Sequence, residues 1–180
     1  INLEVAATKE MQLIALNLTP HAVCLVPERR EERTTEGGLD VVREERELKA
    51  FITPLLEKEI RVSIFVSAEL DQIEAAARIG APVVELNTGI FCNYYCENKM
   101  VEYTNELSKL RKAIIYANQL GLEVHGGHGL SYETVRFVAA IPGIRELNIG
   151  HFLISEAIFE GISSAVKKMR KEIDLAQNCM

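Results

Sequence analysis

Acidic and amide side chains recur two residues apart in three short, otherwise apolar stretches of the chain. The pairs are Asn2 with Glu4, Glu85 with Asn87, and Glu146 with Asn148. Residues two apart share one face of a β-strand, so each pair points to one side and its apolar neighbours to the other. Because a buried carboxylate is costly unless it is paired or hydrogen-bonded, the repeat indicates a functional cavity. An interior polar network that only fixes strand packing is the alternative.

Glu4 lies just before the loop that follows the first of these stretches. A carboxylate that is partly desolvated and close to other acids has a raised pKa, in the range useful for general acid–base chemistry. We therefore predict that Glu4 is a proton shuttle in a partly desolvated position. The residue type alone leaves a salt-bridge role open.

His128 follows an apolar stretch and is bracketed by Gly126, Gly127 and Gly129. Glycines remove side-chain bulk, so a substrate can approach the imidazole and the loop amides closely. The segment therefore predicts a proton donor. His125 and His128 also have HxxH spacing, but residues three apart in an extended segment point to opposite faces and no Cys or His cluster completes a set of ligands. We predict no metal site.

The segment Asn148-Ile149-Gly150-His151 ends the last predicted strand, and a helical pattern starts at Phe152. In α/β barrels this junction commonly binds phosphate, because backbone N–H groups and the positive end of a helix dipole converge there. Gly150 and His151 are therefore candidate phosphate ligands. A surface histidine that only follows a strand is the alternative.

The stretch 28–47 is the most highly charged part of the chain, and Thr34, Gly37 and Gly38 interrupt it. Mixed charge of this kind is typical of a solvated loop. The glycines and the position after a strand also fit a lid that closes over substrate. Composition alone favours the solvated loop, and the glycines with the position after a strand keep the lid as a candidate.

Short apolar runs alternate with longer amphipathic stretches along the whole chain. The predicted strands are 2–6, 22–26, 62–66, 83–88, 123–126 and 146–149. Helix boundaries are marked by capping hydroxyls at Thr8 and Ser131 and by glycines at Gly80 and Gly121. Pro54 begins, kinks or splits a helix in 45–59. The alternation predicts a parallel α/β fold.

Composition sets ordinary bounds on the protein. With 48% hydrophobic and 26% charged residues, the 180 residues can form one domain, 1–180, with a sizeable core. The net charge of −6 argues against nucleic acid as a partner, and no apolar run has the length of a membrane span. Its four cysteines, Cys24, Cys92, Cys96 and Cys179, have no framework spacing, so we expect free thiols in a reducing cytoplasm.

Three motifs together carry a resemblance to a known family. They are Thr34-Thr35-Glu36-Gly37-Gly38-Leu39-Asp40, Gly127-His128-Gly129-Leu130 and Asn148-Ile149-Gly150-His151. The chain resembles pyridoxine 5'-phosphate synthase of vitamin B6 biosynthesis, from Ile1-Asn2-Leu3-Glu4 through Val26-Pro27-Glu28 to the final helix. The resemblance implies a TIM-type (β/α)8 barrel, of which six βα units are present and two N-terminal units are expected upstream.

The resemblance also assigns roles to individual residues. It implies an acid–base pair and a charge-stabilising carboxylate as catalytic groups: Glu4, His128 and Glu85. It implies a second set that binds the phosphorylated substrates: Thr34, Gly129, Gly150 and His151. Asn87 departs from the pattern, because some family members have histidine there.

The implied reaction joins 3-amino-2-oxopropyl phosphate and 1-deoxy-D-xylulose 5-phosphate to give pyridoxine 5'-phosphate, inorganic phosphate and water. This is a transferase-type ring closure without an organic cofactor. The family further implies a cytoplasmic homo-oligomer, an octamer in known members, with no nucleic-acid or membrane partner.

Two rival interpretations remain at the level of sequence. Another phosphate-binding barrel, such as an aldolase or isomerase, shares the fold, since fold alone does not fix chemistry. A lysine at the end of a strand would have favoured Schiff-base aldolase chemistry, and the predicted strands end without one. The second rival is a non-catalytic fragment or assembly protein.

Overall fold

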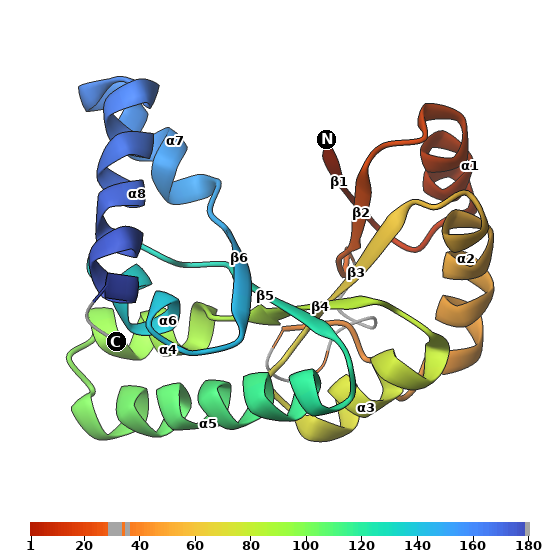
Figure 1. Ribbon diagram of the computed structural model, residues 1–180, viewed down its shortest axis with the longest axis horizontal. Helices are drawn as coiled ribbons and strands as arrows, with labels where there is room; N and C mark the ends of the chain where they lie inside the picture. The colour runs from red at the N-terminus through yellow and green to blue at the C-terminus, as the bar shows by residue number, and fades with distance from the viewer. Residues whose placement is uncertain (29–33, 35–36, 179–180) are drawn as a thin grey trace. The chain divides into compact units, whose positions relative to one another are not determined.

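The computed structural model describes residues 1–28, 34 and 37–178, in which strands alternate with helices from end to end (Figure 1). The strands are β1 (Asn2–Val5), β2 (Ala22–Leu25), β3 (Arg61–Val66), β4 (Val83–Asn87), β5 (Glu123–Gly127) and β6 (Ile144–Asn148). The helices are α1 (Lys9–Leu18), α2 (Glu45–Glu57), α3 (Leu70–Ile79), α4 (Gly89–Cys96), α5 (Met100–Gln119), α6 (Val135–Ala139), α7 (His151–Glu160) and α8 (Ile162–Asn178).

The strands follow one another in a sheet in the order of the sequence, β1-β2-β3-β4-β5-β6. The pairs β1–β2, β2–β3 and β3–β4 are parallel. A strand, a helical crossover and a parallel neighbouring strand form the repeating unit of the (β/α)8 barrel. The prediction of a parallel α/β fold with part of a TIM-type barrel is therefore confirmed.

The chain divides into two compact units. The first comprises Ile1–Asn87 with Tyr116–Val124, and the second comprises Thr88–Ile115 with His125–Met180. We describe each unit by itself. The single domain 1–180 stays a prediction.

In the first unit, the apolar faces of the strands form the core with α2 and α3. Fully buried side chains come from alternate strand positions and from the facing sides of the two helices: Val23, Leu25, Val62, Ile64, Val84, Leu86, Ile52, Leu55, Ile73 and Ala76. This leaves the polar positions of β1 to β4 on the opposite face, because successive strand residues alternate.

The second unit contains two packed groups of side chains. Phe91, Tyr95, Tyr103 and Phe137 form one aromatic cluster, with neighbouring ring centroids 5.5 to 6.4 Å apart. Tyr132, Val135 and Met169 form the buried centre of the other, which packs against residues of β6, α7 and α8.

The helix ends lie close to their predicted positions. Thr8 caps α1 by accepting a hydrogen bond from Met11 N at 3.3 Å, and Gly80 ends α3 with a φ of 89°. Ser131 Oγ accepts a hydrogen bond from Thr134 N at 3.3 Å, although regular helix begins only at Val135. Pro54 lies inside α2, which continues through it to Glu57.

Candidate active site

The first unit places Glu4, Cys24 and Ser63 in one row across three strands. Strand register pairs Glu4 with Cys24 and Cys24 with Ser63. Glu4 is exposed, whereas the other two are buried. β1 is the first strand in the order of the sheet and is paired with β2, and the partly desolvated position expected for Glu4 stays a prediction.

Glu85 is the buried carboxylate of this face, with 5% of its surface exposed. The Cys24 thiol donates to Glu85 Oε2 at 3.5 Å. Burial, followed by the negative charge of Glu85, raises the pKa of Cys24, and the charge of Glu4 adds to the effect. The thiol therefore stays protonated and remains a hydrogen-bond donor toward Glu85.

Ser63 lies against the same thiol. Its hydroxyl is the neighbour that opposes the rise in the pKa of Cys24. Apart from this contact with sulfur, Ser63 Oγ is buried without a hydrogen-bond partner among the described residues. Sequence reasoning treated Cys24 only as a free thiol and did not single out Ser63, because neither has a recognisable motif around it.

Thr34 is held at the end of β3 by the glycines that follow it. Its amide donates to Gly38 O at 2.8 Å, and its hydroxyl lies 3.3 Å from Ser67 Oγ. A Cβ atom on Gly38 would lie 2.7 Å from Val66 Cα, so only glycine fits there. A Cβ on Gly37, whose φ is +92°, would lie 3.3 Å from Asn87 Nδ2.

These contacts place Thr34 and Asn87 in one neighbourhood at the carboxyl ends of β3 and β4. Within the stretch 28–47, for which a solvated loop and a lid were the alternatives, residues 29–33 and 35–36 lie outside the described residues, and neither alternative is tested. The segment from Gly37 onward is well packed, because Leu39 N donates to Phe65 O at 2.9 Å.

In the second unit, His128 follows β5 with an unusual backbone conformation. Its φ is 75°, a region that non-glycine residues seldom occupy, and its side chain is exposed. Thr88 stabilises this turn, since its hydroxyl lies 2.9 Å from Gly127 O and 2.6 Å from His128 O. Its amide also donates to Gly127 O at 2.8 Å. The buried Thr88 was missed by sequence reasoning.

Gly129 packs closely against α4. Its φ is +82°, and a Cβ atom there would lie 3.2 Å from both Cys92 Cβ and Gly89 Cα. Glycine is therefore required by conformation and by space. Burial raises the pKa of the adjacent Cys92 to about 11, so this thiol is also protonated at neutral pH.

His125 and Glu146 form a further polar pair of the second unit. His125 is buried on β5, and its Nδ1 lies 3.6 Å from Glu146 Oε1 on β6. His128 is exposed beyond the end of β5, so the two histidines of the HxxH spacing occupy different environments. Among the described residues, no group of three His, Cys, Asp or Glu side chains could hold a metal ion.

The junction between β6 and α7 has the form expected of an anion site. Gly150 is the N-cap, and α7 begins at His151, one residue before the predicted start. Both residues are exposed, and a Cβ atom on Gly150 would meet nothing within 4 Å. A phosphate site at the N-terminus of α7, where the first backbone N–H groups have no partner within the helix, stays a prediction.

Other predictions concern thiols and membranes. Cys24, Cys92 and Cys96 are free, as predicted, and Cys179 lies outside the described residues. None of the helices in the described part of the chain is long and apolar enough to cross a membrane.

Solved structures with a similar fold belong to enzymes of different chemistry. A HpcH/HpaI-type aldolase/citrate lyase family protein from Burkholderia cenocepacia aligns with a TM-score of 0.59 and 11% identity, over 97% of this chain and 76% of its own. A xylose isomerase domain protein from Planctomyces limnophilus aligns with a TM-score of 0.57 and 13% identity, over 96% and 70%. Identities this low show the fold alone.

Sequence comparison is far more specific. Residues 1–175 match the family described as pyridoxal phosphate biosynthesis protein PdxJ. Pyridoxine 5'-phosphate synthases of Roseobacter denitrificans and Ruegeria pomeroyi are each 57% identical over 177 residues, which is 98% of this chain and 71% of the relative. The Zymomonas mobilis synthase is 51% identical over 98% of this chain and 68% of the relative. By both measures, the chain belongs to the PdxJ family of pyridoxal phosphate biosynthesis proteins.

Proposed function

We propose that this protein is a pyridoxine 5'-phosphate synthase. It condenses 3-amino-2-oxopropyl phosphate with 1-deoxy-D-xylulose 5-phosphate to give pyridoxine 5'-phosphate, inorganic phosphate and water. The observation that carries the proposal is 57% identity to named synthases over 98% of this chain. The reaction needs repeated proton transfers and two phosphate sites, and the polar residues at the strand ends have the chemistry for both.

In this mechanism the amine and the ketone join as an imine, proton shifts expel inorganic phosphate, and an aldol-type closure followed by dehydration forms the ring. Glu4 and His128 exchange the protons. Their exposure in the two units supports these roles, because a general acid or base must reach substrate. Glu85 stabilises charge that develops during the reaction, and its burial favours strong electrostatic interaction.

Four residues bind the phosphorylated substrates in this proposal. The Thr34 hydroxyl supplies a hydrogen bond from the end of β3. Gly129 allows close approach beside His128, and Gly150 with His151 opens the N-terminus of α7 to a phosphate group. The open space around Gly150 supports the last of these assignments.

We also propose that the enzyme is a cytoplasmic homo-oligomer, as the family resemblance implies. Large apolar side chains on α7 and α8 support assembly, because contiguous apolar surface favours a covering partner. Those exposed by more than 45% are Ile154, Ile158, Phe159, Ile162, Val166 and Leu175.

A turnover assay on the intact protein with both phosphates, monitored for pyridoxine 5'-phosphate and inorganic phosphate, tests the reaction. Glu4→Gln keeps the shape of the side chain and removes its titratable proton. We expect kcat to fall about 100-fold or more with little change in KM, the size typical of general acid–base catalysis.

Glu10→Gln, which changes an exposed carboxylate on α1, is the matched control and should turn over normally. Normal kcat in Glu4→Gln would remove Glu4 from the acid–base role. No product from the wild-type protein and both substrates would reject the proposed reaction.

A further inference from the structure

A buried glutamine in the first turn of α3 makes contacts that the proposed mechanism does not use. Gln72 is 6% exposed, whereas the other buried residues of α3 are apolar: Ile73, Ala75, Ala76 and Ile79. A glutamine at such a position is costly unless its amide is hydrogen-bonded.

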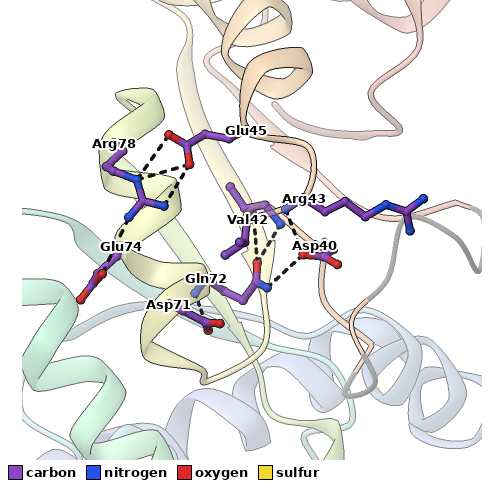
Figure 2. Close-up of polar contacts among 9 residues, drawn as sticks. Asp40, Val42, Arg43, Glu45, Asp71, Gln72, Glu74 and Arg78 are labelled. Atoms are coloured by element: carbon purple, nitrogen blue, oxygen red, sulfur yellow. Dashed lines mark hydrogen bonds and ion pairs between the residues drawn. The ribbon is translucent and has the colours of Figure 1, made fainter.

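Both ends of the Gln72 amide bind residues 40–42, which lie between Thr34 and α2 in the sequence (Figure 2). Its Oε1 accepts from Val41 N at 2.7 Å and from Val42 N at 3.3 Å. Its Nε2 donates to Asp40 Oδ1 at 3.1 Å, and the same oxygen accepts from Arg43 N at 3.2 Å. The Gln72 side chain therefore provides an acceptor for the backbone amides of Val41 and Val42. It also orients the Asp40 carboxylate.

The segment held in this way leads directly to Thr34. Leu39 is bonded to Phe65 O on β3, and Gly38 packs on the backbone of Val66 and Ser67. Gly38 O in turn accepts from the amide of Thr34 at 2.8 Å, with the Thr34 hydroxyl 3.4 Å away. A continuous series of contacts thus joins the first turn of α3 to Thr34.

We propose that Gln72 is a positioning residue for substrate binding, which fixes segment 39–43 and thereby holds the Thr34 hydroxyl at the end of β3. The inference rests on the proposed function, because substrate is the ligand assigned to Thr34. Gln72 itself is buried under the segment and acts through Thr34.

The nearby ion pair between Arg78 on α3 and Glu45 on α2 provides a matched control. Arg78 Nη2 lies 2.9 Å from Glu45 Oε2, and Glu74 Oε2 lies 3.7 Å from Arg78 Nη1 (Figure 2). These side chains are 39 to 49% exposed, so loss of the ion pairs should cost little stability. Arg78→Gln therefore disturbs α2 and α3 without touching Gln72 or the segment.

The experiment combines amide hydrogen exchange with steady-state kinetics on the intact protein. Gln72→Met removes both polar ends at similar length. Gln72→Glu keeps an acceptor for the two amides but places a second carboxylate beside Asp40. We expect exchange over 39–43 to accelerate roughly tenfold or more in Gln72→Met and less in Gln72→Glu, with no change in Arg78→Gln.

For one of the two phosphate substrates, KM should rise about tenfold in Gln72→Met while kcat changes much less. Thr34→Val should raise the same KM. Adding Gln72→Met to Thr34→Val should then have little further effect, because residues that act through one group are not additive.

Unchanged exchange in both Gln72 variants would overturn the structural part of the proposal. Faster exchange with unchanged KM, or full additivity with Thr34→Val, would overturn the positioning role. A wild-type protein that does not turn over the two phosphates would instead reject the proposed function. Hydrogen exchange would still test whether Gln72 stabilises segment 39–43. If Gln72→Met does not fold, Gln72→Glu supplies the same comparison.

Discussion

At the scale of single residues, the thiol of Cys24 is the unexpected component of the polar face of β1 to β4. A protonated thiol is a weak donor, and here it is directed at a buried carboxylate. Because burial and the charge of Glu85 raise its pKa, the Cys24 thiol does not ionise and add a third negative charge to those of Glu85 and Glu4. Cys24 therefore separates two carboxylates while hydrogen-bonding to one.

Cys24→Ala should weaken catalysis by removing this donor from Glu85. We expect kcat/KM to fall about tenfold, within the range for a hydrogen bond to a charged group. Cys24→Ser should recover part of the loss. A hydroxyl is a stronger hydrogen-bond donor than a thiol, but its C–O bond is shorter than the C–S bond, so it lies farther from Glu85. Steady-state kinetics with the two phosphates measures this, and Cys96→Ser, at an exposed thiol, is the control. Equal rates in Cys24→Ala and wild type would contradict the role.

If phosphate binds at the N-terminus of α7 as proposed, Gly150 and His151 should make separate contributions to its affinity. Gly150→Val should fold, since the space around its Cβ position is open, but should obstruct a phosphate at the first amides of α7. We expect Kd to rise about tenfold or more. His151→Ala should change it less than about threefold, because the amides remain. Calorimetric titration with each phosphate distinguishes the two, and unchanged affinity in Gly150→Val would place the phosphate elsewhere.

At the scale of elements, Tyr132 links the turn before α6 to the helices that follow β6. Its ring packs edge-on against Phe152 with centroids 4.8 Å apart, and Lys168 Nζ lies 4.1 Å from the ring centroid. Its hydroxyl donates to Glu160 Oε1 at 2.7 Å. These contacts join α7 and α8 to the rest of the second unit through one side chain.

This arrangement predicts a loss of stability in alkali. Burial, followed by the hydrogen bond to Glu160, raises the pKa of Tyr132 to about 12. An acid whose pKa is higher in the folded state stabilises the fold below its unfolded pKa of about 10, and this contribution disappears as pH rises toward the folded value.

Tyr132→Phe isolates the effect, because it removes the titrating group and keeps the ring. At about pH 9 the variant should be less stable than wild type by about 1 kcal/mol, the size of one hydrogen bond. The difference in the free energy of unfolding should shrink between about pH 10 and about pH 12. Urea unfolding at several pH values measures it, and a constant difference would show that Tyr132 does not titrate as described.

At the scale of the whole molecule, the fold does not determine which reaction is catalysed. Structures with TM-scores of 0.57 to 0.59 belong to proteins named for isomerase, aldolase and citrate synthase chemistry. The assigned residues are divided between the two units: Glu4, Thr34 and Glu85 belong to the first, and His128, Gly129, Gly150 and His151 to the second. That Glu4 and His128 act together as an acid–base pair on one substrate therefore stays a prediction.

The sequence by itself determined the features that depend on neighbouring residues. Alternation of apolar and polar residues predicted every strand to within two residues at each end, because side-chain period is a local property of the chain. Capping at Thr8 and the left-handed turn at Gly80 were also local, since each needs only the residues of one helix end. Short motifs were sufficient to indicate the family, which the comparisons confirmed.

Only the tertiary structure decided which distant side chains meet. Cys24 and Glu85 are 61 residues apart and come together through the register of three strands. Gln72 reaches Val41 across 31 residues, and Thr88 reaches Gly127 across 39. Such contacts depend on strand register and on the path of the crossovers, neither of which is visible in local patterns of residue type.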